Sequence, residues 1–118
     1  MEPLNDKRPW GEFRQFTRNE PTTVKLITVE PHQELSLQYH KNRKEFWRIL
    51  SGSGIIQIGD EKIPAQKGDE FVIEAEQNHR ISAGDTQIEF LEIAFGDFDE
   101  NDIVRIEDKY GRESTPKE

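Results

Sequence analysis

Apolar and polar residues alternate in short runs along most of this chain. The runs are rich in Val, Ile and Phe and are bounded by turn-forming residues such as Gly59-Asp60 and Lys67-Gly68-Asp69. The runs lie at residues 24–29, 34–39, 46–52, 54–59, 70–75, 79–83 and 88–95. No window carries a sustained apolar stripe at helical spacing. The pattern predicts an all-β sandwich or barrel built largely from hairpins.

Chain length and the character of the termini predict the domain organisation. A chain of 118 residues favours one domain with a single core. Residues 1–7 and 113–118 are polar and contain proline, so we expect flexible ends on either side of a domain that spans residues 8–112.

Charge and composition exclude several classes of function. Sixteen Lys and Arg residues against 24 Asp and Glu residues give a net charge of −8, which opposes binding to nucleic acid or to anionic membranes. The chain has no cysteine, so any metal must be bound by nitrogen and oxygen ligands. No apolar run approaches the ~20 residues that a spanning helix needs, and the N-terminus lacks an apolar signal core. We therefore expect a soluble cytoplasmic protein.

The segment SLQYHKNRKEFW, residues 36–47, concentrates polar side chains that can bind a metal. On a strand, Gln38 and His40 share a face, and a turn at KNRK could bring Glu45 back opposite them. His79 is a fourth candidate, at the start of a later run. The alternative is a polar patch on a strand with hydrogen-bonded histidines, and spacing alone leaves both possibilities open. His32, in a turn, is expected to have no role.

These same residues carry a resemblance to a known family. The spacing Q-x-H-x4-E-x6-G from Gln38 to Gly52, and G-x5-E-x-E-x2-H from Gly68 to His79, resemble the two cupin motifs, with glutamine in place of the first histidine. Four longer segments, RPWG, VKLITVEP, LSLQYHKNRKEFWRILSG and NDIVRIEDKYGR, are similar to the cupin domain of type II phosphomannose isomerases. The resemblance runs from about Lys7 to Arg112. That domain usually forms the C-terminal part of bifunctional enzymes that also carry a guanylyltransferase domain, which is absent from this sequence.

The resemblance implies a single-domain cupin β-jelly-roll barrel with a divalent metal ion in one end. Carried over residue by residue, it implies Gln38, His40, Glu45 and His79 as metal ligands. Zinc is the first expectation for such ligands, with Mn, Co, Ni or Fe as alternatives. The family commonly has two further histidines, and here Asn42 and Phe46 stand in their places.

The chemistry of the family, interconversion of mannose 6-phosphate and fructose 6-phosphate through a cis-enediol, requires further residues. A base must move a proton between C1 and C2, and a cation must hold the phosphate. The ionisable candidates for catalysis are Lys25 and Arg112. Arg43, Arg80 and Arg112 compete for the phosphate, and each could equally be a solvated surface charge. Trp47 is either barrel core or a platform for the sugar ring.

Three functions are compatible with these residues. The first is a metal-dependent sugar-phosphate isomerase, the second a non-catalytic cupin that binds a sugar or sugar phosphate, and the third a metal-dependent oxygenase. The expected partner is a small-molecule sugar phosphate, with no nucleic acid and no membrane. Because a small jelly roll has exposed strand edges, we also expect a homodimer.

Overall fold

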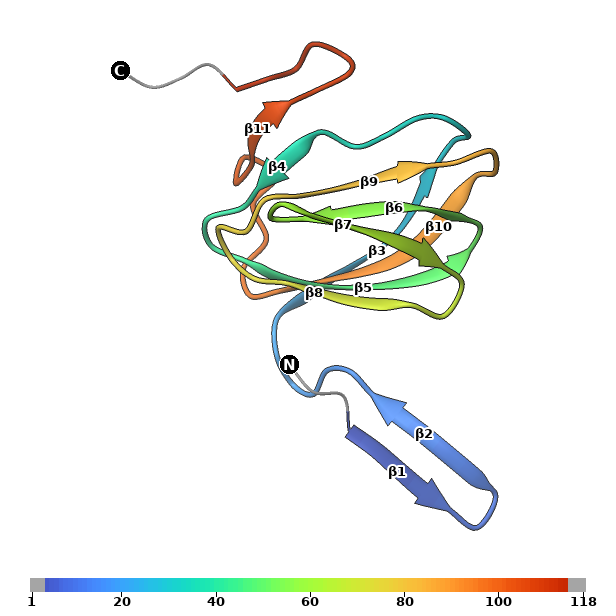
Figure 1. The fold of residues 1–118 in the computed structure, drawn as a ribbon. Coiled ribbons are helices and arrows are strands. Elements are labelled where there is room, and N and C mark those ends of the chain that lie inside the picture. The colour runs from blue at the N-terminus through green and yellow to red at the C-terminus, as the bar shows by residue number, and fades with distance from the viewer. Residues whose placement is uncertain (1–3, 115–118) are drawn as a thin grey trace.

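The protein consists of strands joined by short turns and loops (Figure 1). The computed structural model describes residues 4–114. The strands are β1 Leu4–Arg8, β2 Gly11–Gln15, β3 Thr22–Val29, β4 Leu37–Tyr39, β5 Lys44–Ser51, β6 Ser53–Ile58, β7 Glu61–Gln66, β8 Glu70–Ile73, β9 His79–Ala83, β10 Ile88–Phe95 and β11 Val104–Glu107. No helix in the described range is long and apolar enough to cross a membrane.

Two antiparallel sheets form the body of the protein. One has the strand order β3-β10-β5-β8 and the other the order β11-β4-β9-β6-β7. The strands β1 and β2 form a separate hairpin that projects away from both sheets (Figure 1). The prediction of an all-β fold is therefore confirmed. In each sheet, some strands that pair with each other are distant in sequence.

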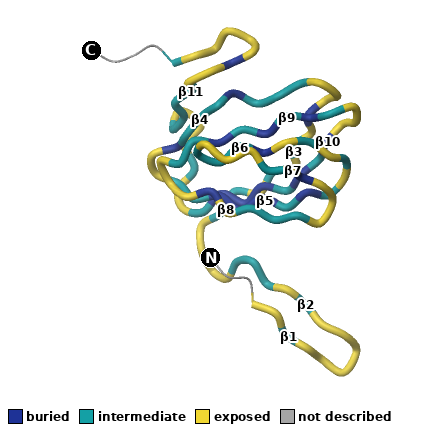
Figure 2. Tube along the Cα trace, viewed as in Figure 1, coloured by how far each residue is buried: buried dark blue, intermediate teal, exposed yellow. Residues whose placement is uncertain are grey.

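The core lies between the two sheets and is built by strand alternation. The buried residues Trp47 and Ile49 of β5 and Phe90 of β10 meet Ile56 of β6 and Ile81 of β9. Because side chains alternate between the two faces of a strand, every second residue of these strands reaches the core. Figure 2 shows that burial is concentrated on these strands, whereas the projecting hairpin is largely exposed.

Each of the seven predicted runs contains a strand, although the run at 34–39 forms one only over Leu37–Tyr39. Four strands lie outside the predicted runs: β1, β2, β11 and, at residues 61–66, β7. That strand contains Pro64, which lacks the N–H that a central strand needs. Its position at the edge of the five-stranded sheet resolves the conflict, because an edge strand pairs on one side only.

The two ends are more ordered than the sequence suggested. Residues 4–7, which were expected to be flexible, form β1, because the turn at Pro9-Trp10 folds the chain back along β2. Near the other end, the Ser114 backbone N–H donates to the Arg105 carbonyl and its hydroxyl accepts from the Arg105 N–H, both at 2.9 Å. The remaining residues of both predicted flexible ends, 1–3 and 115–118, lie outside the described range.

We expect the turn between β5 and β6 to require glycine on two grounds. Gly52 has φ +79°, and a Cβ there would lie 2.0 Å from the carbonyl oxygen of Gln87. Gly59 has φ +59° but no heavy atom within 4 Å of the corresponding position. Gly59→Ala should therefore cost only the strain of a positive φ, about 1–2 kcal/mol, whereas Gly52→Ala should cost about 2–4 kcal/mol. Urea unfolding followed by the fluorescence of buried Trp47 measures both, and equal losses would contradict the close-contact argument.

Candidate metal centre

Three potential metal ligands meet inside one end of the two sheets. His40 directly follows β4, Glu45 is the second residue of β5, and His79 opens β9. One potential ligand atom from each of these residues lies within 4.8 Å of the others, and all three side chains are buried. His40 Nε2 is 3.7 Å from Glu45 Oε2, and His79 Nε2 is 3.5 Å from Glu45 Oε1. The structure thus brings together three of the four ligands expected from the sequence.

Backbone carbonyls orient both imidazoles. His40 Nδ1 donates to the carbonyl of Asp102 at 2.6 Å, and His79 Nδ1 donates to the carbonyl of Gln77 at 2.9 Å. A carbonyl oxygen only accepts, so each Nδ1 carries the proton and each Nε2 keeps its lone pair. The two lone pairs are on the nitrogens that face Glu45. Such a partner on the other ring nitrogen is what fixes the orientation of metal-binding histidines in proteins.

The two oxygens of the Glu45 carboxylate are in different situations. Oε2 accepts from Arg43 Nε at 2.9 Å, whereas Oε1 is buried and has no hydrogen-bond partner among the described residues. Burial alone would raise the pKa of Glu45, but the hydrogen bond from His79 and the positive charges that His40 and His79 carry when protonated, together with the Arg43 guanidinium, outweigh it and lower that pKa. The group is therefore an ionised carboxylate with one free oxygen, a costly arrangement in a protein interior unless a cation meets that oxygen.

The chemistry of the donor set fits a divalent metal ion. Burial is the main cause that lowers the pKa of His40, so its imidazole stays neutral and able to bind a metal. An Arg43 amine lies 3.3 Å from His40 Nε2, so a metal bound at this nitrogen has to displace that N–H. Two imidazole nitrogens and a carboxylate oxygen suit Zn²⁺ and other first-row divalent ions.

Gln38, the fourth expected ligand, lies beside the cluster on the neighbouring strand. It pairs directly with His79 across β4 and β9, which puts the two side chains on the same sheet face. Its amide nitrogen donates to the Ser36 carbonyl at 3.4 Å. This placement is compatible with a role as a ligand, which stays a prediction.

Two basic side chains and one aromatic ring gather beside the cluster, which Arg43 contacts directly. Arg43 lies over the Phe98 ring at 4.5 Å, and the Lys25 amine lies over the same ring at 4.4 Å. Lys25 also pairs with Glu100 at 3.3 Å. Phe98 and Glu100 belong to the segment between β10 and β11, which therefore contacts Lys25 and Arg43 at this end of the sheets.

Of the other residues predicted for the site, two lie elsewhere. Arg80 follows His79 on β9, so it faces the opposite side of the sheet, where it pairs with Glu107 at 3.1 Å. Arg112 was expected to fold over the barrel mouth, but it pairs with Asp108 at 2.7 Å in the turn after β11. Neighbouring residues tie that turn to the segment between β3 and β4, through Tyr110 to Gln33 and Lys109 to the His32 carbonyl.

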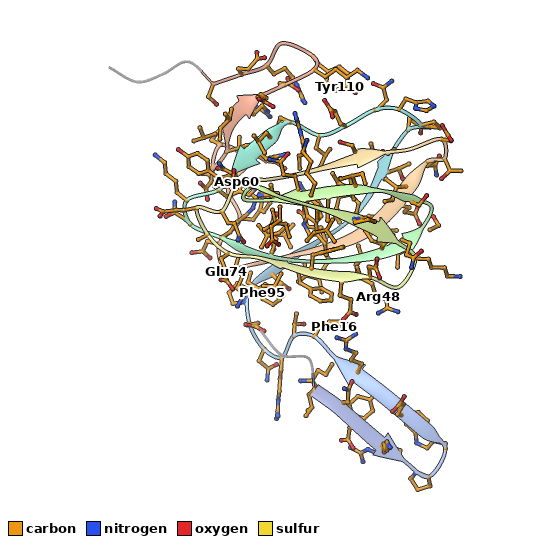
Figure 3. The ribbon with its side chains drawn as sticks, viewed as in Figure 1. Phe16, Arg48, Asp60, Glu74, Phe95 and Tyr110 are labelled. Atoms are coloured by element: carbon orange, nitrogen blue, oxygen red, sulfur yellow. The ribbon has the colours of Figure 1, made fainter. Side chains whose placement is uncertain are left out.

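Figure 3 places Tyr110 far from Glu74 and Phe95, which mark the ends of β8 and β10 nearest the cluster. Trp47 belongs to the core, where its ring packs 4.4 Å from that of Phe90 and 5.5 Å from that of His79. Its exposed fraction is 1%, which favours the core interpretation over a sugar platform. His32 is an exposed loop residue near Asp85, as its place in a turn indicated.

The sequence reasoning missed Glu92 on β10. This residue pairs with Lys25 and Trp47 on the two neighbouring strands and shares their interior face. Burial raises the pKa of Glu92 to about 7, and the negative charge of Glu45 adds to the shift. The signal was available in the sequence, because alternation places Glu92 on the same face as Ile88 and Phe90, where a charged residue is exceptional.

Asp102 was also missed, and it organises the loop after β4. Its carboxylate accepts hydrogen bonds from the backbone N–H groups of Lys41 at 2.8 Å and Asn42 at 3.0 Å. Burial works against its ionisation, but these two donors outweigh burial and lower the pKa of Asp102. Together with its carbonyl bond to His40, this residue joins the β10–β11 segment to the metal ligands. No spacing rule connects residues 62 positions apart, so only the fold reveals it.

Comparison with known proteins identifies the family. The family described as "Mannose-6-phosphate isomerase C-terminal" matches residues 4–108. The xanthan biosynthesis protein XanB of Xanthomonas campestris pv. campestris is 37% identical over 107 residues, which cover 89% of this chain and 23% of XanB. The chain thus spans about a quarter of the length of this relative.

Solved structures agree on the fold. A cupin protein from Bacteroides fragilis superposes with a TM-score of 0.60 at 33% identity, over 66% of this chain and 70% of that one. A protein assigned provisionally as a sugar phosphate isomerase, from Acidithiobacillus ferrooxidans, has a TM-score of 0.59 at 26% identity, over 64% of this chain and 50% of that one. The protein is therefore an all-β cupin, and it belongs to the family of the mannose-6-phosphate isomerase C-terminal domain.

Proposed function

We propose that this protein is a metal-dependent isomerase that interconverts an aldose phosphate and a ketose phosphate, with mannose 6-phosphate and fructose 6-phosphate as its substrates. The buried cluster of His40, Glu45 and His79 carries the proposal, because its two lone pairs and its unpartnered carboxylate oxygen face one another. Membership in the mannose-6-phosphate isomerase C-terminal family supports the choice of reaction and substrate. The likeness to the A. ferrooxidans protein points in the same direction.

His40, Glu45 and His79 would hold the metal, and Gln38 is the residue placed to complete the set. Zinc is the first choice for such ligands, with Mn, Co, Ni or Fe as alternatives. A bound divalent ion supplies a Lewis acid that polarises the oxygens on C1 and C2 of the sugar. The protein residues then have to hold the phosphate, move a proton between the two carbons and exclude bulk water.

Glu92 is the residue that we propose for the proton transfer. In the forward direction the Glu92 carboxylate takes the proton from C2, the electron pair forms the C1–C2 double bond, and O1 gains a proton. The cis-enediol then collapses as Glu92 returns its proton to C1 and O2 loses its own. Glu92 faces the interior from the strand next to Glu45, and its pKa of about 7 suits a base that works near neutral pH.

Lys25 and Arg43 are the cations that we propose for the phosphate. Arg80 and Arg112 pair with carboxylates away from the cluster, whereas Arg43 contacts Glu45 and shares the Phe98 ring with Lys25. From the sequence, Lys25 was predicted as a candidate catalytic residue. Its ammonium group pairs with Glu100 and lies over the Phe98 ring, so we propose that it binds an anion rather than moving the proton.

The two family histidines that are replaced here have unequal consequences. Phe46 is buried on the outer face of its sheet, where its ring lies 5.1 Å from that of Phe16. It therefore points away from Glu45 and Trp47, its neighbours on β5, so a histidine at this position would not reach the cluster. Asn42 is an exposed loop residue next to Arg43. The replacement at position 42 is thus the one that bears on catalysis.

We expect loss of metal when either imidazole is removed. His40→Ala and His79→Ala each delete a nitrogen ligand, so both should lose most of their bound Zn²⁺, whereas His32→Ala should retain it. At free metal 100-fold above the dissociation constant, the metal should stabilise the wild type by ~2.7 kcal/mol. Elemental analysis after dialysis and thermal melts with and without added Zn²⁺ measure both effects. Unchanged metal content in the two variants would refute the site.

We expect the wild type loaded with metal to form fructose 6-phosphate from mannose 6-phosphate in a coupled assay. Lys25→Met should reduce the preference for the phosphorylated sugar over free mannose by about one to two powers of ten, because it removes a charge-assisted bond. Lys67→Met is the matched control, since that exposed lysine lies in the turn between β7 and β8, which hydrogen-bonds to Ile49 toward the far end of β5. If the protein binds mannose 6-phosphate but shows no turnover with Zn, Mn, Co, Ni or Fe, it is instead a non-catalytic protein that binds a sugar phosphate.

Glu92 should leave a signature in the pH dependence of stability of the metal-free protein. The raised pKa means that the folded state keeps a proton that the unfolded state releases, so this group lowers stability as pH rises from 4.5 to about 7. Glu92→Gln cannot titrate. The difference in unfolding free energy, variant minus wild type, should therefore grow across this window, by ~3 kcal/mol at most.

Urea unfolding at several pH values in the presence of a chelator tests this expectation. If the unfolding free energies of wild type and variant change in parallel with pH, the pKa of Glu92 is not raised in the folded state. Loss of isomerase activity in Glu92→Gln, with zinc content unchanged, is the accompanying expectation for its part in the reaction. A variant that keeps both zinc and full activity would show that another group moves the proton.

A further inference from the structure

A hollow lies on the outer face of the five-stranded sheet, away from the metal cluster. Its volume is about 250 Å³, and it extends over β6, β7 and β9. The residues that line it are Glu34, Ile55, Gln57, Lys62, Arg80 and Ser82. Arg80 directly follows His79 on β9, so the hollow and the cluster lie on opposite faces of this strand. The hollow is therefore separate from the proposed reaction centre.

Strand pairing brings the six side chains together in two rows across the sheet. Lys62, Gln57 and Arg80 form one row, and Ile55, Ser82 and Glu34 form the other. Residues two apart on a strand share a face, so both rows point to the same side. Asp60, labelled in Figure 3, lies in the turn between β6 and β7, beside the first row. Polar groups from three strands and one loop thus surround a single apolar side chain, that of Ile55.

Protein hydrogen bonds hold several of these polar groups in place. Arg80 Nε donates to the Leu35 carbonyl at 3.2 Å, and Arg80 Nη1 donates to Glu107 at 3.1 Å. The Ser82 hydroxyl donates to Glu34 at 3.0 Å. Side chains that are already ordered lose little freedom when a ligand binds, which lowers the entropic cost of binding.

The same groups keep hydrogen-bonding capacity for a ligand. The Gln57 amide nitrogen donates to the Gly59 carbonyl at 3.1 Å, which leaves the amide oxygen as an acceptor. The carboxylate of Glu34 can accept further bonds, and the ammonium group of the exposed Lys62 can donate. The hollow therefore offers both donors and acceptors.

The balance of charge argues against an anion as the occupant. Arg80 lies 3.8 Å from Glu34 and 3.1 Å from Glu107, so its charge is compensated. A phosphate would meet the Glu34 carboxylate as well as Lys62, in a chain whose net charge is −8. Hydroxyl groups both donate and accept, so they match this lining without a net charge.

An apolar stretch continues the hollow along the sheet. Ile55 is 42% exposed, and it also lines a second hollow of about 420 Å³ that includes Pro64. The residues that line this second hollow are all uncharged. The C–H face of a sugar ring can pack on such aliphatic side chains while its hydroxyls reach the polar rows. We call the two adjoining hollows the β6–β7 groove.

We propose that the β6–β7 groove binds an uncharged oligosaccharide. One sugar ring packs on Ile55 and exchanges hydrogen bonds with Glu34, Gln57 and Lys62, and the next ring extends past Pro64. The inference stands apart from the proposed isomerase reaction and does not depend on a bound metal.

NMR titration of the full chain, labelled with ¹⁵N, tests the proposal. Cellotetraose and mannotetraose serve as uncharged probes, with tetragalacturonate and inorganic phosphate as anionic comparators. The uncharged probes should shift the amide signals of Gln57, Lys62 and Ser82 and leave that of Glu45 unchanged. The absence of such shifts with both uncharged probes, or tighter binding of either anion at these residues, would overturn the proposal.

Two pairs of matched variants separate the groove from general surface effects. Ile55→Ser removes the apolar contact, and Lys62→Met removes a hydrogen-bond donor, so each should weaken binding by about threefold to tenfold. Val72→Ser is the control for the first, since Val72 is 36% exposed on the outer face of the other sheet. Lys67→Met, in the turn between β7 and β8, is the control for the second. Equal affinities within either pair would contradict a site in the groove.

Discussion

The rest of the site depends on one constraint, a carboxylate buried inside an apolar barrel. Glu45 is 1% exposed, and an ionised group at such depth is tolerated only when cations or hydrogen-bond donors compensate it. Arg43 meets one oxygen, and the two imidazoles face the carboxylate from neighbouring strands. The other oxygen is left for a cation that the protein does not itself supply. The arrangement around Glu45 thus could hold a metal ion, which would compensate the remaining charge.

The imidazoles are held by backbone rather than by side chains. The carbonyls of Asp102 and Gln77 accept the Nδ1 protons, and both belong to segments outside the strands that carry the histidines. A carbonyl cannot donate, so it imposes a single tautomer at every pH at which the imidazole is neutral. The reliability of the donor set therefore rests on the path of two loops, and the carboxylate of Asp102 secures one of them through Lys41 and Asn42.

Alternation in the sequence was enough to predict most strands of the two sheets, because they follow from the two-residue period of a strand. Spacing alone left the convergence of His40, Glu45 and His79 as one of two possibilities, and only the resemblance to the family implied it. The same period, applied to Arg80 and Phe46, also shows that they face away from the cluster, and to Glu92, that it faces inward. The position of Arg112 and the bond from His40 to Asp102 could not be predicted in this way. They depend on loop paths that are set by contacts between distant residues, for which short-range patterns carry no information.

The contact between His40 and the carbonyl of Asp102 has a consequence for how ligands communicate at this end of the barrel. The segment that carries Asp102 also carries Phe98, whose ring contacts both Arg43 and Lys25. A shift of that segment would therefore also shift the carbonyl that orients the His40 ring. Two ligands that each bias the position of this segment would change each other's affinity by the same factor.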